Sequence, residues 1–129
     1  MDEGSKITLK IGDKTYDIQM YNLSYHPKTA KERNESTFVN NTSNTISISI
    51  RSSKLDQEFI DWIFAVDQQP KDGQIIVYDG DSDKVIKTIT FTGATTSSYN
   101  EGFNIASFGL NNSRTTTFGL RYKTVSIKL

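Results

Sequence analysis

Hydrophobic and polar residues alternate along most of this chain, which is typical of β-strands with one buried face. Residues 7–11 and 16–20 alternate in this way on either side of Gly12-Asp13, so they predict a hairpin. Residues 46–50 repeat the pattern, with isoleucine at every second position and serine between. We therefore expect a mainly β protein.

The C-terminal half predicts a second hairpin. Residues 73–79 (GQIIVYD) and 85–91 flank the acidic turn DGDSD. A further strand is expected around residues 95–99 and another from 103 to 110. The last strand is expected to run from Thr115 to Leu129.

The alternation changes phase at two places, near Met20-Tyr21 and near Lys123-Thr124, where the apolar positions shift from even to odd numbers. Strand side chains alternate faces strictly, so each shift must be absorbed by a bulge or a sharp bend. Long strands that bend at bulges suit a small closed barrel, which needs strong coiling and tilt. The pattern favours a small bulged β-barrel over a flat sandwich.

One stretch, residues 53–66 (SKLDQEFIDWIFAV), follows a helical pattern. Its apolar residues recur at steps of three, four and seven, which brings them onto one face. Ser53 is a suitable N-cap, and Asp56 lies in the first turn, where a negative charge suits the helix dipole. We expect Trp62 to belong to the core rather than to a ligand platform, because it shares the apolar face, formed by Leu55, Phe59, Trp62, Ile63 and Val66.

Residues 27–45 form a long polar connection in which Phe38 and Val39 are the only adjacent large apolar residues. Connections of this length without structure of their own are uncommon in compact domains. The segment is either a solvated surface loop or an ordered arm that docks on a partner, and the sequence leaves both open.

Composition narrows the function classes. The 129 residues fit one domain, 1–129, and contain 15 basic and 15 acidic side chains. This balance provides no basic footprint for a nucleic acid. Cysteine is absent, which excludes disulfides, thiolate zinc sites and thiol nucleophiles. The N-terminus lacks the pattern of a secretory signal, and no apolar run reaches the ~20 residues that span a bilayer, so we expect synthesis in the cytoplasm and no membrane insertion.

Catalytic and metal-binding chemistry finds little support. The sequence from Asp79 to Asp83 begins like a calcium loop, but Lys84 replaces the glycine of the sixth position and Thr90 the glutamate of the twelfth. We interpret it as a solvated turn. His26, the single histidine, precedes a proline at a strand end, which favours a structural or interface role. No catalytic residue, metal or cofactor is expected.

Hydroxyl side chains line one face of several expected strands. Such a surface can border a water-filled channel or simply face solvent. The residues concerned are Ser47, Ser49, Thr88, Thr90, Thr92, Thr115 and Thr117.

The order of short patterns from the helix onward resembles the Hcp family. These are FIDWIFAV, a Lys-Asp-Gly turn, GQIIVYD, an acidic turn, KVIKTITFTGA and YNEGF. More narrowly, the chain resembles the TssD-type tube proteins of type VI secretion systems in Bacteroidetes. The preceding hairpin, long connection and third strand agree with that layout, so the resemblance covers nearly the whole chain. It departs from the classical proteobacterial form, with which it shares few recognisable sequence motifs.

The resemblance implies a β-barrel with one helix, assembled into hexameric rings that stack as the inner tube of a contractile machine. It implies a sheath, a spike and small effector proteins as partners, export without a signal peptide, and no enzymatic activity. The long arm would contact neighbouring subunits or rings. Its expected interface residues are His26, Pro27, Lys28, Lys31, Arg33, Asn34, Phe38 and Val39.

Two alternatives stay open. A tail tube protein of a phage or phage-derived particle would share the fold but serve another machine. A ligand-binding β-module would use exposed rings such as Tyr21, Tyr25 or Tyr99 as a sugar platform. An enzyme is the least favoured class.

Overall fold

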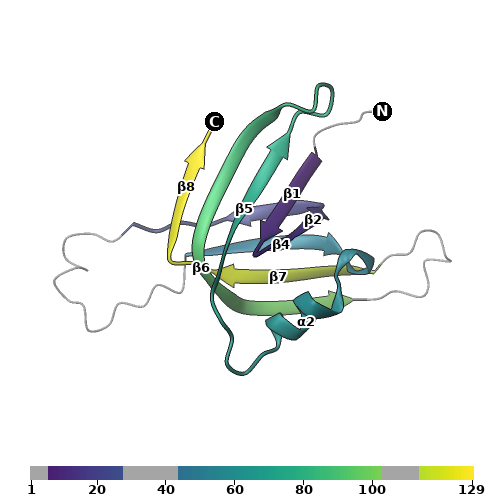
Figure 1. The fold of residues 1–129 in the computed structure, drawn as a ribbon, viewed down its shortest axis with the longest axis vertical. Coiled ribbons are helices and arrows are strands. Elements are labelled where there is room, and N and C mark those ends of the chain that lie inside the picture. The colour runs from purple at the N-terminus through teal and green to yellow at the C-terminus, as the bar shows by residue number, and fades with distance from the viewer. Residues whose placement is uncertain (1–5, 28–43, 103–113) are drawn as a thin grey trace.

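The computed structural model describes residues 6–27, 44–102 and 114–129. Two curved layers of antiparallel strands share one long strand, and the short helix α2 lies beside them (Figure 1). The elements in chain order are β1 (Lys6–Ile11), β2 (Lys14–Ile18), β3 (Met20–Leu23), β4 (Thr45–Arg51), the 3-10 turn η2 (Ser52–Lys54), α2 (Gln57–Ile63), β5 (Lys71–Tyr78), β6 (Val85–Gly102), β7 (Thr115–Arg121) and β8 (Thr124–Lys128).

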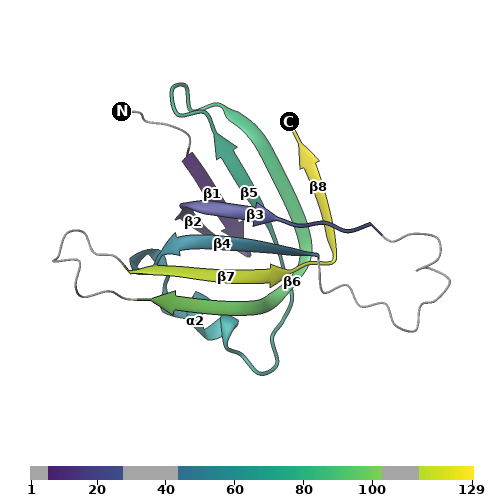
Figure 2. The same cartoon turned by 180° about the vertical axis from the view of Figure 1, so that it is seen from behind.

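The layers differ in their strands. The first, sheet A, contains β2, β1, β5, the first half of β6 and β8. The second, sheet B, contains the second half of β6, then β7, β4 and β3. Figure 2 shows β3, β4, β7 and β6 as neighbours in sheet B, with β1, β5 and β8 crossing above them. Within the described residues no hydrogen-bonded ladder joins β2 to β3, so the expected barrel is a strongly coiled but open sheet.

Both predicted hairpins are confirmed. β1 pairs with β2 across Gly12, which has the positive φ of 62° that such turns require, and β5 pairs with β6 across the acidic turn. The strand expected at residues 95–99 exists as the continuation of β6. Gly93, at φ 65°, bends that strand without ending it. The strand expected from 103 to 110 lies outside the described residues.

The two phase shifts correspond to bends. The first falls at Gln19, between β2 in sheet A and β3 in sheet B, one residue before its expected place. The second falls at Tyr122 and Lys123, where the chain leaves sheet B and pairs with β6 again in sheet A. At each bend the chain passes from one sheet to the other, and the extra residue there shifts the alternation by one position. The side chains that face the core can therefore differ in parity between the two sheets.

The core lies between the inner faces of the two sheets. Sheet A contributes the row Leu9, Ile75 and Ile89, whose members are at most 1 % exposed. Sheet B contributes a row that crosses all four of its strands: Tyr21, Ile48, Phe118 and Tyr99. Phe59 of α2 packs between the sheets, with its ring 5.2 Å from the rings of both Tyr16 and Phe118. The helix therefore bridges the layers.

The helix is shorter than its pattern predicted. Asp56 is the N-cap, with a side-chain oxygen that accepts a hydrogen bond from Phe59 N at 3.0 Å, so the expected N-cap at Ser53 is wrong. Ser53 lies in the preceding 3-10 turn. The expected C-terminal end is also wrong, since the helix stops at Ile63 and Val66 is 98 % exposed. Trp62 is buried, as expected.

Candidate subunit interface

The predicted interface residues divide into two groups. His26 and Pro27 follow β3 and are exposed. Lys28, Lys31, Arg33, Asn34, Phe38 and Val39 lie outside the described residues. The structure therefore places two members of the predicted set at the surface and leaves the other six as a prediction.

The two ends of the 27–45 connection are fastened to each other. Ser24 N donates to Thr45 O at 2.9 Å, and His26 N donates to the side-chain oxygen of Asn44 at 2.7 Å. Tyr122 fixes this stem to the bend before β8, because its hydroxyl donates to Ser24 O at 2.7 Å. Burial raises the pKa of the Tyr122 hydroxyl, so it stays a donor. The stem has a defined geometry at the point where the connection leaves the sheet.

Sheet B has two open edges in the described part of the chain. One is β3, which pairs only with β4. The other is the second half of β6, which pairs with β7 on one side and with no strand on the other. Unpaired strand edges present rows of backbone donors and acceptors that readily pair with another chain. The edges of sheet B, like the edges β2 and β8 of sheet A, are therefore suited to contact with a second subunit.

Gln68 covers part of the β6 edge. Its side-chain oxygen accepts from Thr96 N at 2.8 Å, and its nitrogen donates to Thr96 Oγ1 at 2.7 Å and to Trp62 O at 2.8 Å. The segment that follows α2 is thereby held beside β6. Thr96 needs no strand partner on this side, whereas the edge beyond it remains open.

An apolar corner lies beside that open edge. It consists of the Phe64 and Tyr99 rings together with Val66, which follows Phe64 two residues further along the chain, and Phe64 and Val66 are 61 % and 98 % exposed. The Phe64 ring meets the Tyr99 ring edge-on, with centroids 4.9 Å apart. Phe64 N also donates to Ile60 O at 3.2 Å, so this residue is fixed to the end of α2. Sequence reasoning missed this corner because it assigned Val66 to the buried helix face.

The outer faces of the two sheets differ in charge. On sheet B, small uncharged residues occupy the middle of all four strands: Asn22, Ser47, Ser49, Ser98, Asn100, Thr117 and Gly119. Arg51 and Arg121 lie at the two ends of this surface. On sheet A, Lys10, Asp17 and Lys128 alternate with threonines. The expected hydroxyl faces thus belong to separate surfaces of the molecule.

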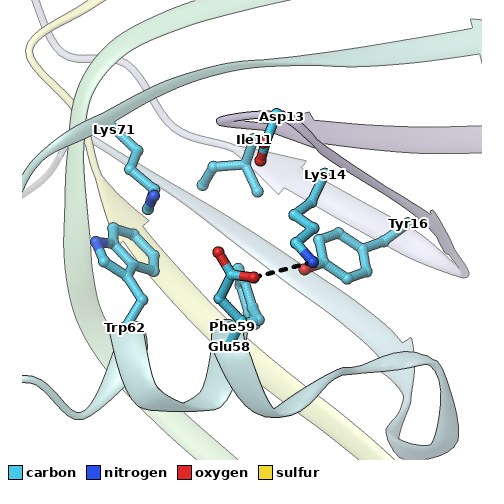
Figure 3. Close-up of a pocket in the computed structure, with 8 residues that line it drawn as sticks. All are labelled: Ile11, Asp13, Lys14, Tyr16, Glu58, Phe59, Trp62 and Lys71. Atoms are coloured by element: carbon cyan, nitrogen blue, oxygen red, sulfur yellow. Dashed lines mark ion pairs between the residues drawn. The ribbon is translucent and has the colours of Figure 1, made fainter.

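A small pocket of about 80 Å³ separates α2 from the β1–β2 turn (Figure 3). Lys14 Nζ lies 3.1 Å from Asp56 Oδ2 and 3.0 Å from Glu58 Oε1, and the Tyr16 hydroxyl donates to Asp56 Oδ1 at 3.1 Å. Opposite them, Lys71 Nζ lies 5.8 Å from the Trp62 ring centroid. These contacts fasten the helix to the first hairpin, and we assign the pocket a structural role.

The same contacts shift the pKa values of three groups. The hydrogen bonds to Glu58 and then to Asp56 raise the pKa of Lys14. Burial, followed by the hydrogen bond to Asp56, raises the pKa of Tyr16 to about 12. The hydrogen bond from Phe59 N, with further support from Lys14 and Tyr16, lowers the pKa of Asp56. All three pKa values move away from neutral pH, as expected around an N-cap that is held in its charged form.

The acidic turn is fixed by its own hydrogen bonds. Asp79 Oδ1 accepts from Asp81 N at 3.2 Å and Asp79 Oδ2 accepts from Ser82 Oγ at 3.1 Å, while Asp83 adopts a positive φ of 60°. Across residues 6–27, 44–102 and 114–129, no three His, Cys, Asp or Glu side chains are grouped to hold a metal ion. No helix within these ranges is long and apolar enough to cross a membrane.

The fold is shared with two Hcp1 structures and with a tube complex of an extracellular contractile injection system. Hcp1 from Flavobacterium johnsoniae superposes with a TM-score of 0.70 at 22 % identity, over 95 % of this chain and 94 % of that one. Hcp1 from Salmonella typhimurium gives 0.70 at 11 % identity, over 97 % and 85 %. The sheath-tube complex of the extracellular contractile injection system PVC gives 0.67 at 13 % identity, over 95 % and 88 %.

The chain belongs to the TssD family of hemolysin coregulated proteins (Hcp), whose family model matches residues 3–128. This family consists of structural tube proteins and not of enzymes. None of the curated proteins matches the sequence. The resemblance noted in the sequence is therefore confirmed at the level of family and fold.

Proposed function

We propose that this chain is a single-domain subunit of a type VI secretion inner tube, which forms hexameric rings that stack. The family match over residues 3–128 carries this proposal. The similar fold of the PVC sheath-tube complex supports a role in a tube, and the similar anti-feeding prophage baseplate was solved with 6-fold symmetry. A sheath would expel the stacked rings, and small effector proteins would travel inside them.

The strand directions of sheet B support ring closure. β3, β4, β7 and β6 alternate in direction, so the two outer strands, β3 and β6, run in opposite directions. A second copy related by rotation about a ring axis can therefore bring its β3 beside β6 and continue the antiparallel pattern. Repetition of one heterologous contact closes a ring when the rotation angle fits.

The outer face of sheet B is the better candidate for the lumen wall. Its centre contains small hydroxyl and amide side chains without charges, so it offers few strong contacts to a passing polypeptide. The outer face of sheet A, with its lysines and aspartate, would then face outward. The stem at His26 and Pro27 would direct the connection, with the six predicted contact residues, toward a neighbouring subunit or ring.

The purified 129-residue chain tests the ring directly. Light scattering is expected to give a mass near six times 14.5 kDa, and electron microscopy should reveal six-fold rings. A strict monomer at high concentration, with no rings under any condition, would contradict the proposal.

Site-specific labelling tests the lumen assignment. The chain has no cysteine, so Thr117→Cys on sheet B and Thr90→Cys on sheet A each create one thiol on an otherwise unlabelled protein. Gold-maleimide should appear at the inner wall of the rings for Thr117→Cys and at the outer rim for Thr90→Cys. The reverse pattern would show that sheet A lines the lumen.

A phage-derived contractile particle is the second candidate. The PVC sheath-tube complex matches this chain with nearly the TM-score of the Hcp1 structures. The genes beside this one distinguish the machines, since type VI membrane-complex genes would support the first proposal and extracellular particle genes the second.

A further inference from the structure

The exposed apolar corner of one subunit suggests a contact with an apolar strand edge of another subunit. We infer that Phe64 and Val66 of one copy pack against the inner-face side chains of β3, Tyr21 and Leu23, of the next copy. This inference rests on the proposed ring and specifies the side chains of its subunit contact.

The corner is strongly exposed in the isolated subunit, as apolar residues are when a partner covers them in an assembly. Val66 is 98 % exposed and Phe64 is 61 % exposed, yet contacts with Tyr99 and Ile60 hold Phe64 in place. A fixed aromatic side chain loses little conformational freedom when a partner covers it, which is why such residues often anchor interfaces.

The rows of the sheet indicate what can cover it. Tyr21, Ile48, Phe118 and Tyr99 lie at one level across sheet B, on its inner face. A second copy whose β3 continues the sheet beyond β6 would bring its own Tyr21 to the level of Tyr99, on the same face. Phe64, already against Tyr99, would then meet Tyr21.

The opposing edge is chemically compatible with the corner. Tyr21 and Leu23 pack against the core but remain partly exposed, so each offers apolar surface at the sheet edge. The sequence from Ile18 to Tyr25 contains no charged residue. Asp67 and Glu101, which flank the corner, therefore meet no carboxylate on that strand, and no like-charge repulsion opposes the contact.

The contact joins two different surfaces of the same chain. Such a heterologous contact repeats around a ring, whereas an isologous contact would stop at a dimer. An interface of ordinary stability buries roughly 800 Å² on each partner, so the corner would supply its anchor and the open strand edges the rest.

Assembly of charged variants tests the contact. Val66→Asp changes a side chain that is almost fully exposed in the subunit, so folding is expected to stay intact. The concentration needed for ring formation should rise at least tenfold, as measured by light scattering. Val85→Asp, at a position 50 % exposed at the far end of β6, is the matched control and should form rings like the unmodified chain. Normal assembly of Val66→Asp would overturn the inference.

Cross-linking provides an independent readout. In assembled rings, Phe64→Cys combined with Tyr21→Cys should give a ladder of covalent oligomers with a short bis-maleimide, while each single variant should give none. Absence of a ladder, or dimers from Phe64→Cys alone, would overturn the inference. Failure of the unmodified chain to form rings would instead reject the proposed function.

Discussion

The two halves of β6 differ in how completely they are paired. The first half, in sheet A, has β5 on one side and β8 on the other. The second half, in sheet B, has β7 on one side, and no strand of the described chain on the other. The same strand is thus paired on both sides in its first half and on one side in its second half. Among the described strands of sheet A the open edges are β2 and β8, whereas in sheet B the long strand β6 is itself an edge, beside the end of α2.

Phe59→Ala should have the largest effect on stability, because it removes the side chain that packs between sheet A and sheet B. The Phe59 ring contacts Tyr16 of sheet A and Phe118 of sheet B and is only 4 % exposed. Its truncation should lower the free energy of unfolding by about 3–5 kcal/mol. Guanidinium unfolding followed by Trp62 fluorescence measures the loss, with Phe64→Ala as a control that should change it much less.

Substitution of one glycine in each sheet tests how well that sheet tolerates an added side chain. A Cβ at Gly73 of sheet A would collide with Lys10 O and lie 2.6 Å from the Phe91 ring, which cannot move without disturbing the core. A Cβ at Gly119 of sheet B would crowd the hydroxyls of Ser97 and Ser98, at 2.7 and 2.8 Å, and would meet the Ser98 nitrogen at an ordinary 3.8 Å. We expect Gly73→Ala to cost about 3 kcal/mol and Gly119→Ala about 1 kcal/mol. Equal unfolding midpoints for the two variants would show that the sheets are equally rigid.

Gln68→Ala tests the cover over the β6 edge. The substitution removes the partners of Thr96 N and Thr96 Oγ1 and should cost roughly 1–2 kcal/mol. Hydrogen exchange of the Thr96 amide should accelerate, while amides of the first half of β6 keep their protection. Gln69→Ala is the control, since its backbone oxygen still accepts from Trp62 Nε1. Unchanged exchange at Thr96 would contradict this account of the edge.

The smallest effect concerns the attachment of α2 to sheet A. Asp56→Ala removes the N-cap, the ion pair with Lys14 and the acceptor of the Tyr16 hydroxyl, and should lower the unfolding temperature by less than Gln68→Ala does. Asp56→Asn, which still offers a capping oxygen, should cost less. Thermal unfolding of the two variants at neutral pH separates the cap from the charge.

The same carboxylate gives the fold an acid dependence. The pKa of Asp56 is lower in the folded than in the unfolded chain, so its contribution to stability is present above about pH 4 and is lost as the pH falls through the folded value. Asp56→Asn should lack this contribution and lose less stability on acidification. Parallel pH titrations of unfolding would contradict this if both proteins changed alike.

The sequence predicted features set by local side-chain patterns. Alternation identified both hairpins, and the phase shifts located the bends near Gln19 and Tyr122 within a residue or two. The helix ends were wrong because Asp56 competes successfully with Ser53 as N-cap and the chain turns away after Ile63. Separate strands were expected at residues 85–91 and around 95–99, whereas β6 runs through both, with Gly93 at a positive φ between them.

The open edges could not be predicted from the sequence. Whether β3 or the second half of β6 lacks a partner depends on which strands lie beside it, and pairing between distant segments is not written in local alternation. Phe64 and Val66 did carry a signal, because the apolar run IFAV extends beyond the buried face of a seven-residue helix. The end of α2 at Ile63 shows that Phe64 and Val66 lie beyond the buried face.

The stem beneath the long connection has a consequence for how this protein can diversify. Ser24, His26, Asn44 and Thr45 bring the chain back to nearly the place from which it departs. Closing a loop of different length costs little once its ends are fixed, because the entropic penalty grows only slowly with length. Insertions or exchanges between the two stem strands should therefore leave both sheets intact, so the connection can change in length and sequence independently of the fold that carries it.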